Sequence, residues 1–471
     1  MNANKVLQFS IGPIVGALLG LITLPIVTWF FSPEDIGRLT MLQVATSFSL
    51  LFFSIGLDQA YVREFHEVED KAVLLKSVVA PGLVILVFVV AILSLLPYSI
   101  SYFLFGIESV YLTILMIISV FFSFASRFMS LILRMQERGL AYSMSQVLSK
   151  LLFLMIVGSY VLLSFDTIFD NLIMAHVLSL FVVLTVFAWN TRFVWMLAIS
   201  ARIDKDKLAQ MVRYAIPLIG GGLAFWGLTA MDKFFLRTLS SFEELAVYSV
   251  SVSFAGSALV FQAIFSTIWA PIVYKWVAIG IDASHVKNVI DKVSLGIMVI
   301  WSLAGMFSWT VIYILPEEYA KVQIILLAAM AYPLLYTLSE ATGVGISVKR
   351  KTIYSFLSVV VSLIVNGLGN YALIPKYGAS GAAISSAIAF LLFFILKTEF
   401  SYGLWESFGR VSMYLLVLCA LVLSVISNLI EINVFYRITL WLCLIVLTFI
   451  IYRKSASEIF LYLKTHMQGN L

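Results

Sequence analysis

IGPIVGALLGLITLPIVTWFF, residues 11–31, is the stretch that decides the class of this protein. It contains no charged side chain, and its length matches the ~20 residues with which a helix crosses a bilayer. The polar turn SPEDIGR follows at 32–38, and a second apolar run begins at Leu39. This alternation predicts membrane-spanning helices joined by short turns.

A related stretch follows half a chain later, at residues 216–235. Both stretches have the same spacing between a proline and a Phe-Phe pair, and a pair of acidic residues follows each. This similarity predicts a duplicated helical bundle, with the function between the two copies. The matching residues are Pro13, Phe30, Phe31, Glu34 and Asp35 in the first copy and Pro217, Phe234, Phe235, Glu243 and Glu244 in the second.

The composition identifies a membrane protein. The sequence is 62% hydrophobic and 12% charged, whereas a soluble domain is about half apolar and about a quarter charged. We expect an all-α integral membrane protein, because only helices and closed barrels satisfy the backbone in lipid and these runs are too long for barrel strands. About fourteen transmembrane helices are predicted, at residues 9–31, 39–60, 77–97, 110–132, 143–164, 171–190, 214–236, 245–273, 293–315, 322–346, 353–374, 380–397, 411–429 and 437–452.

Lys and Arg are unequally distributed between the turns on the two sides of these helices, and most lie on the side that holds both termini. Because cytoplasmic turns carry the excess of positive charge, we expect both termini in the cytoplasm. No small-residue cleavage site follows the first run, so we expect this helix to be retained rather than removed as a signal peptide.

The duplication divides the chain into four parts. Residues 1–190 (helices 1–6) and 214–400 (helices 7–12) are expected to form two lobes around a central cavity. Because six helices separate the copies, both lobes begin on the same side and have parallel topology. The basic, amphipathic segment 191–213 is expected to be a linker on the cytoplasmic surface. Residues 401–471 hold helices 13 and 14, for which we expect peripheral packing, and a cytoplasmic tail.

Signatures of enzymes, metal sites and nucleic-acid binding are not found in the sequence. The four histidines are far apart and form no metal-ligand pair, and Gly220-Gly221-Gly222 lacks the Lys-Ser or Lys-Thr of a phosphate-binding loop. The two cysteines lie inside predicted helices and suggest no disulfide framework. The basic residues are scattered between apolar runs, which does not favour a nucleic-acid partner. We expect no catalysis, no metal and no cofactor.

Helix 4 carries the first candidate site. Ser123, Arg127, Ser130 and Arg134 follow one another at spacings of four, three and four, which places them on one helical face. Buried charges in a membrane are expensive, so this face favours a substrate-binding role for Arg127 and Arg134. The alternative is that both arginines extend to the cytoplasmic headgroups, which is the better reading for Arg134.

Helix 7 carries the second pair of candidate cations. Lys233 and Arg237 are four residues apart, so they share a face on which like charges repel unless an anion lies between them. The alternative is an anchor at the outer interface, with Asp232 partly neutralising the pair.

Other polar residues inside helices complete the set. Asp58, Asp232 and Glu340 are candidates for ion coupling or for a gate, and Glu340 could equally pair with a basic turn. Spacings of four or multiples of it place further polar groups on single faces of helices 2 and 11. Those expected to line a polar cavity are Gln43, Ser47, Asn366 and Asn370. A cationic cavity in a membrane suits an anionic or phosphate-bearing substrate, because arginine donates two parallel hydrogen bonds to phosphate.

Three stretches resemble the Wzx-type flippases that export O-antigen and other polysaccharide repeat units, within the multidrug/oligosaccharidyl-lipid/polysaccharide exporter superfamily. They are GPIVGALLGLITLPIVTWFFSPEDIGRLTMLQVATSF (12–48), LFFSIGLDQAYVREFHE (51–67) and FSTIWAPIVYKW (265–276). The resemblance covers essentially the whole chain. It implies that undecaprenyl-pyrophosphate-linked oligosaccharide is flipped from the inner to the outer leaflet of the bacterial cytoplasmic membrane, for synthesis of O-antigen in lipopolysaccharide or of another surface polysaccharide.

The resemblance also implies coupling to an ion gradient, with H⁺ or Na⁺ as the coupling ion, and alternating access by rocking of the two lobes. Its implied partners are the lipid-linked oligosaccharide, membrane lipids, a polysaccharide polymerase and a chain-length regulator. Two alternatives stay open at this point. One is a multidrug or cation antiporter on the same fold, and the other is a non-transporting scaffold of a polysaccharide assembly complex.

Overall fold

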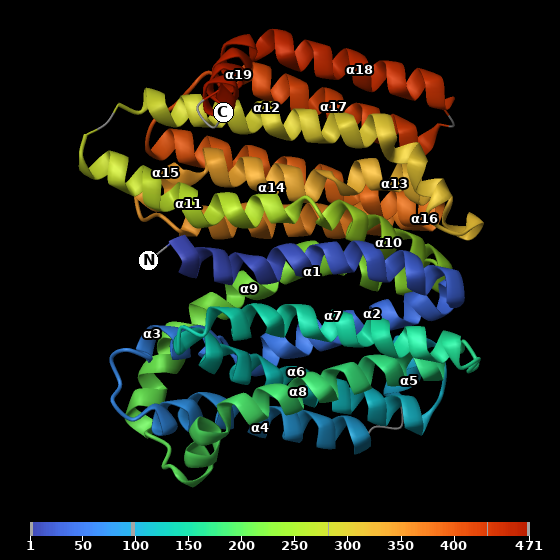
Figure 1. Ribbon diagram of the computed structural model, residues 1–471, viewed down its shortest axis with the longest axis vertical. Helices are drawn as coiled ribbons and strands as arrows, with labels where there is room; N and C mark the ends of the chain where they lie inside the picture. Colours follow the sequence, from blue (N-terminus) through green and yellow to red (C-terminus); the bar gives the residue numbers. More distant parts are fainter. Residues whose placement is uncertain (1–2, 96–98, 281, 431, 469–471) are drawn as a thin grey trace. The chain divides into compact units, whose positions relative to one another are not determined.

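The computed structural model describes residues 3–95, 99–280, 282–430 and 432–468, and every regular element within these ranges is a helix (Figure 1). The chain forms two compact units. Unit 1 consists of Met1–Arg237 and Ser241–Ala246, and unit 2 consists of Thr238–Ser240 and Val247–Leu471. The boundary between the units therefore lies within a few residues of the turn that follows Leu239.

Twelve helices of the described chain are long and apolar enough to cross a membrane. One of them, α16 (Ile353–Leu404), is a hairpin of two spanning arms, since it reverses at Gly378 and its residue Asn366 lies against Ser385. The apolar helix α1 (Ala3–Phe30) adds one more span. The protein is thus a multi-pass, all-α membrane protein, in agreement with the fourteen helices expected from the sequence.

Unit 1 is a bundle of long helices that alternate in direction (Figure 1). Its helices are α1, α2 (Pro33–Ser54), α3 (Leu57–Glu64), α4 (Lys71–Leu95), α5 (Ile100–Phe105), α6 (Val110–Met135), α7 (Gly139–Leu162), α8 (Phe169–Ser200) and α9 (Lys205–Leu239), together with the start of α10 (Phe242–Gly256). We call the end with the turns after Phe31, Phe105 and Leu239 the Phe31 end. The opposite end, with the turns after Glu64, Met135 and Ser200, is the Arg63 end.

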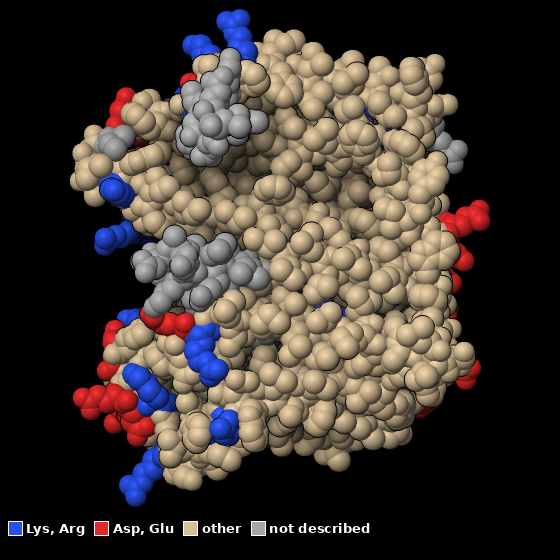
Figure 2. Space-filling model, in the orientation of Figure 1, with Lys and Arg blue, Asp and Glu red and all other residues tan. Residues whose placement is uncertain are grey.

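Unit 2 contains the remaining helices. They are α11 (Leu259–Ala278), α12 (Ser284–Phe307), η1 (Ser308–Tyr313), η2 (Glu317–Tyr319), α13 (Val322–Ala329), α14 (Ala331–Thr342), α15 (Val344–Val348), α16, α17 (Val411–Leu429), α18 (Val434–Ile451) and α19 (Arg453–Gln468). The charged side chains on the visible face gather at helix ends and leave the middle of the helices largely uncharged (Figure 2). This distribution is that of helices whose central parts face hydrocarbon.

The turn after α1 is built by its polar residues. The Ser32 hydroxyl accepts a hydrogen bond from the Asp35 amide at 3.2 Å and caps α2, with Pro33 at the first helical position. Arg38 then bonds both acids of this turn, Glu34 and Asp35, each at 3.0 Å. The SPEDIGR stretch is therefore a folded helix start.

Three segments differ from the sequence-based prediction. The predicted helix at 39–60 is broken, because Ile55 (φ 50°) and Gly56 (φ 65°) adopt the left-handed conformation and end α2 before α3 begins. The predicted helix at 245–273 is likewise divided, into α10 and α11. The predicted linker 191–213 is not a separate segment, since α8 continues to Ser200 and α9 starts at Lys205.

Candidate functional site

The break between α2 and α3 places a carboxylate against the arginine face of α6. Asp58 lies in the first turn of α3, and its Oδ2 accepts a hydrogen bond from Nη2 of Arg127 at 2.6 Å. The Asp58 side chain is 10% exposed, whereas the Arg127 side chain is 33% exposed. One edge of the guanidinium therefore remains accessible while Asp58 balances its charge.

A second layer of charges holds α3 at the Arg63 end. Lys207 of α9 forms an ion pair with Glu64 at 2.5 Å, and the guanidinium of Arg63 lies 4.4 Å from the centroid of the Tyr214 ring. On α4, the Lys76 ammonium donates to the carbonyl oxygens of Ile199 and Ala201, at 2.6 and 2.7 Å. The contacts of Glu64 and Arg63 hold α3, which presents Asp58, against α9, and those of Lys76 join α4 to the end of α8.

Arg134 does not join this arrangement. Its side chain is exposed in the last turn of α6, and its guanidinium lies 5.9 Å from the centroid of the Tyr142 ring. It forms no ion pair with the residues that the structure describes. Arg127 and Arg134 thus share a helical face but differ in environment, which agrees with a headgroup contact for Arg134.

Lys150 is a further cation within a span, outside the set of predicted site residues. Its ammonium donates to the carbonyl oxygen of Gly16 at 2.7 Å and so joins α7 to α1. The sequence does contain a signal for this residue, because a lysine within a membrane-spanning helix costs free energy unless its ammonium group has a partner.

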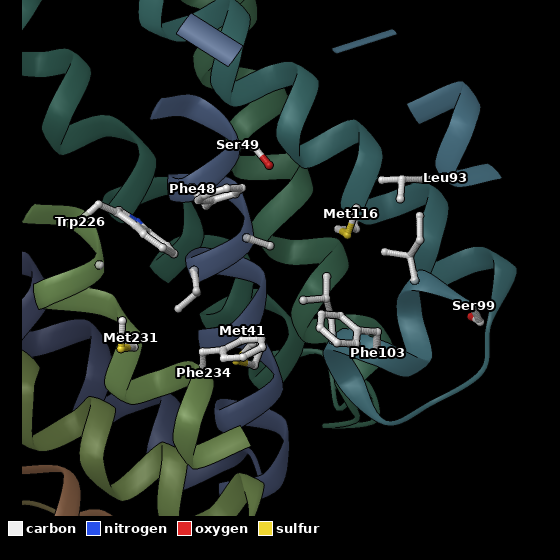
Figure 3. Close-up of a pocket in the computed structure, with 15 residues that line it drawn as sticks. Met41, Phe48, Ser49, Leu93, Ser99, Phe103, Met116, Trp226, Met231 and Phe234 are labelled. Atoms are coloured by element: carbon white, nitrogen blue, oxygen red, sulfur yellow. The ribbon is translucent and has the colours of Figure 1, made fainter. Parts of the chain in front are cut away.

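At the Phe31 end, unit 1 contains a cavity of about 740 Å³ between α2, α4, α5, α6 and α9 (Figure 3). Trp226 borders it and donates from Nε1 to the Ser47 hydroxyl at 3.1 Å, and its ring lies 5.0 Å from that of Phe48. Ser47 and Gln43 are both exposed, one turn apart on α2. The structure thus uses Ser47 to orient an aromatic wall. The cavity is lined by Met41, Val44, Ala45, Phe48, Ser49, Leu93, Ser99, Ile100, Phe103, Leu104, Met116, Trp226, Gly227, Met231 and Phe234.

Two arginines meet beside this cavity. Arg237 donates to the carbonyl oxygens of Leu104 (3.3 Å) and Tyr102 (3.4 Å), and Arg38 donates to that of Phe105 (3.1 Å). These carbonyls belong to the last turn of α5, where the C=O groups at the end of a helix carry partial negative charge.

The two arginines also share the ring of Phe242. The Arg38 and Arg237 guanidiniums lie 5.2 and 4.5 Å from its centroid. Arg38 is neutralised by Glu34 and Asp35, whereas Arg237 has no carboxylate partner among the described residues. Arg237 therefore makes no ion pair within the described residues, while the two acids and two arginines of this cluster together carry no net charge.

Asp232 and Lys233 precede this arginine on α9. Asp232 is buried, with 1% of its surface exposed, and Lys233 is partly exposed. Lys233 makes no hydrogen bond or ion pair within the described part of the chain. The Arg237 guanidinium points toward α5, where it donates to backbone carbonyl oxygens. That Lys233 and Arg237 bind one anion together therefore stays a prediction.

In unit 2, Glu340 of α14 forms an ion pair with Lys397 of α16. The Lys397 ammonium also lies 5.8 and 5.4 Å from the ring centroids of Tyr336 and Phe393. Of the two readings of Glu340, the structure shows the pairing with a base.

The predicted cavity residues of helix 11 are enclosed. Asn366 and Asn370 have none of their surface exposed. The Ser385 hydroxyl lies 2.9 Å from both the carbonyl oxygen and Oδ1 of Asn366 and donates to them. Asn366 thus connects the two arms of the α16 hairpin, and cavity lining by either asparagine stays a prediction.

Sequence comparison gives the family. A model of the polysaccharide biosynthesis protein family (Polysacc_synt) matches residues 3–277, more than half of the 471 residues. The chain belongs to this family. No curated protein sequence matches the chain. The resemblance to polysaccharide exporters read from residues 12–48, 51–67 and 265–276 is thereby confirmed at the level of the family, and all of these residues lie within the matched range.

Solved structures show the same fold for this polysaccharide biosynthesis protein. The structure described as lipid II flippase MurJ in an inward closed conformation matches with a TM-score of 0.67 and 15% identity, over 97% of this chain and 99% of that chain. An inward-facing multidrug resistance MATE family transporter of the MOP superfamily matches with a TM-score of 0.57 and 14% identity, over 85% of this chain and 98% of that one. At such identities the likeness concerns the fold.

In this member of the polysaccharide biosynthesis family, the predicted site residues form separate groups. Asp58 and Arg127 come together in unit 1, and Arg237 lies at the opposite end of the same unit. Glu340 belongs to unit 2. What the sequence missed is the set of partners, namely Lys397 for Glu340 and the carbonyl groups of α5 for Arg237. These partners lie far along the chain or in the backbone, so spacing on one helix does not reveal them.

Proposed function

We propose that this chain flips undecaprenyl-pyrophosphate-linked oligosaccharide repeat units from the inner to the outer leaflet of the bacterial cytoplasmic membrane, for synthesis of O-antigen or another surface polysaccharide. Membership of the polysaccharide biosynthesis family and a multi-pass fold shared with flippases and transporters support this proposal. The chain acts as a transporter, and both of its termini lie in the cytoplasm.

The observation that carries the proposal is the Asp58–Arg127 pair. A lone guanidinium within a membrane is costly, and a partner carboxylate lowers this cost while no substrate is bound. Because Arg127 is 33% exposed, its free edge can bind a second anion. A pyrophosphate then competes with Asp58, since arginine binds phosphate oxygens through two parallel hydrogen bonds.

This competition provides a route to ion coupling. When the pyrophosphate takes the guanidinium, the enclosed Asp58 carboxylate loses its counter-charge and favours binding of H⁺ or Na⁺. Release of the substrate restores the ion pair and expels the cation. Glu340 and Asp232 are further candidates for the coupled group, and Lys397 has the role of counter-charge for Glu340.

The first experiment measures flux of a fluorescent undecaprenyl-pyrophosphate oligosaccharide in proteoliposomes that contain only this protein, with and without an imposed H⁺ or Na⁺ gradient. We expect gradient-dependent movement. Arg127→Ala should lower the initial rate about tenfold or more, because a hydrogen bond to a charged group contributes about 1.5–3 kcal/mol. Arg127→Lys should retain part of the rate, and the matched control Arg134→Ala should retain nearly all of it.

The outcomes separate the proposal from its alternatives. Absence of flux under any gradient, from folded protein, supports a scaffold of an assembly complex or the need for a polymerase or chain-length regulator. Gradient-driven movement of lipophilic cations without lipid-linked sugar supports the multidrug antiporter. Equal, full rates for Arg127→Ala and Arg127→Lys overturn the assignment of Arg127. A gradient dependence that survives Glu340→Gln removes Glu340 from the coupling scheme and leaves Asp58 and Asp232.

A further inference from the structure

The cavity at the Phe31 end of unit 1 has the composition of a hydrocarbon site. Of its lining residues only Ser49 and Ser99 are polar, and the Ser99 hydroxyl is engaged by the Ser101 hydroxyl at 2.7 Å. Water needs several polar partners in an enclosed space and finds few here. The remaining wall is aliphatic, aromatic or methionine.

The size of the cavity suits a small ligand or a segment of a lipid chain. Its volume of about 740 Å³ lies within the range of small-molecule sites, about 300–1,000 Å³. The cavity is open on one side, so a ligand can enter it from its surroundings. The wall is also accessible, since Phe48, Phe103 and Phe234 are 39%, 59% and 40% exposed.

The charge beside the cavity defines one end of this occupant. Phe234 lines the cavity, and Arg237 follows it by three residues on the same helix. The Arg237 guanidinium is held against α5, whose residues Ile100, Phe103 and Leu104 form the adjacent wall. Arg237 has no carboxylate partner among the described residues and is held by backbone oxygens, so its guanidinium can bind an anion next to an apolar space.

We infer that this cavity holds the hydrocarbon chain of a polyprenyl phosphate or pyrophosphate, with the phosphate at Arg237. The inference rests on the proposed function, which supplies this carrier lipid. It assigns the hydrocarbon chain of the lipid to a site distinct from Arg127. Three methionines line the cavity, Met41, Met116 and Met231. Methionine adapts its shape to flexible ligands, and aromatic faces contact methyl-branched, unsaturated chains over a large area.

The test measures binding of radiolabelled geranylgeranyl pyrophosphate to the purified full chain in detergent. Ala45→Trp and Ser49→Phe fill the cavity from α2, and each should lower the affinity about tenfold through lost apolar burial. Val84→Trp is the matched control, because Val84 is 66% exposed on α4 and does not line the cavity. Thermal unfolding of each variant shows whether it is folded, and two filling variants keep the test valid if one fails to fold.

Arg237→Gln separates the contribution of the phosphate. It should lower the affinity for geranylgeranyl pyrophosphate about tenfold and change the affinity for uncharged geranylgeraniol by less than twofold. Arg192→Gln is the control for loss of a surface arginine, since Arg192 lies over Trp189 and Phe193 instead. Inorganic pyrophosphate alone should compete weakly with the probe, because the hydrocarbon chain of the probe contributes most of the binding free energy.

Binding and flux together distinguish the failures. If both filling variants bind the probe as the wild type does, the cavity does not bind the hydrocarbon chain, and the inference fails. Flux of lipid-linked sugar by the wild type would still support the proposed flippase function. If phosphatidylglycerol displaces the probe at equal concentration, the site holds bilayer lipid, which also overturns the inference. If filling the cavity weakens binding while the wild type moves no lipid-linked sugar, the lipid site stands and the proposed function fails.

Discussion

Two arginines of unit 1 show how the same side chain serves different roles. Arg127 is balanced by a carboxylate on a neighbouring helix, at 2.6 Å. Arg237 is held by backbone carbonyls at 3.3 and 3.4 Å and by the ring of Phe242, with no carboxylate among the described residues. A carboxylate can be displaced by a competing anion, whereas carbonyl groups fix the position of the guanidinium and leave its charge available. The comparison suggests an exchangeable site at the Arg63 end and a permanent one at the Phe31 end.

The largest effect on this comparison should come from Gly37→Ala. A Cβ atom at Gly37 would lie 2.2 Å from the carbonyl oxygen of Phe242, so the start of α10 must move. We expect a loss of about 3 kcal/mol or more, as for other overpacked sites. Because the Phe242 ring contacts the guanidiniums of both Arg38 and Arg237, the affinity for geranylgeranyl pyrophosphate should fall as well.

Thermal unfolding in detergent measures the first effect and probe binding the second. Gly221→Ala is the control, since a Cβ there meets no atom within 4 Å. An unchanged melting temperature for Gly37→Ala would show that α2 and α10 are not in close contact.

A smaller loss of stability should follow Asp58→Ala. This variant leaves Arg127 without its counter-charge, which costs about 3–5 kcal/mol at a fully buried site. Since Arg127 is 33% exposed, we expect about 2 kcal/mol. The double variant Asp58→Ala/Arg127→Ala should recover part of this loss, because no unpaired charge remains.

A double-mutant cycle of unfolding free energies provides the measurement. Additive effects of the two substitutions would contradict an exchangeable pair. No such recovery is expected for Arg237, which has no acidic partner among the described residues whose removal could compensate.

The smallest effect should come from Arg134→Ala. Its exposed guanidinium contacts only the ring of Tyr142, at 5.9 Å from the centroid. Surface substitutions of this kind change stability by about 0.5 kcal/mol or less. The melting temperature and the flux should both stay close to those of the wild type. A flux loss as large as that of Arg127→Ala would place both arginines in one site and remove the distinction between the two ends.

The sequence predicted the number and limits of most helices well, because apolar length without charge is a strong local signal. The break at Ile55 and Gly56 was not predicted. Two residues in the left-handed conformation change the apolar pattern and the helix propensity of the segment only slightly. The amphipathic segment 191–213 was assigned to a linker because its charges end the apolar run. In the structure the helices continue into that polar region.

Candidate residues were predicted from helical faces and their partners were not. The shared face of Ser123, Arg127, Ser130 and Arg134 follows from spacing alone. The pairing of Arg127 with Asp58 joins residues 69 positions apart, and Arg237 bonds backbone carbonyls more than 130 positions away. Both contacts depend on how helices associate, which periodicity does not encode. The same holds for Glu340, whose partner Lys397 lies 57 positions further on.

The placement of α9 has a consequence for the ancestry of this protein. The predicted duplication would make α9 the first helix of the second copy, yet its residues up to Arg237 belong to unit 1 and line the cavity there. If the duplication is real, an ancestor with a single copy could complete that cavity only with a helix from a second molecule, as in a domain-swapped dimer. Coexpression of fragments 1–203 and 204–471 tests whether this helix can be donated between molecules, because the second fragment should then restore the cavity of the first.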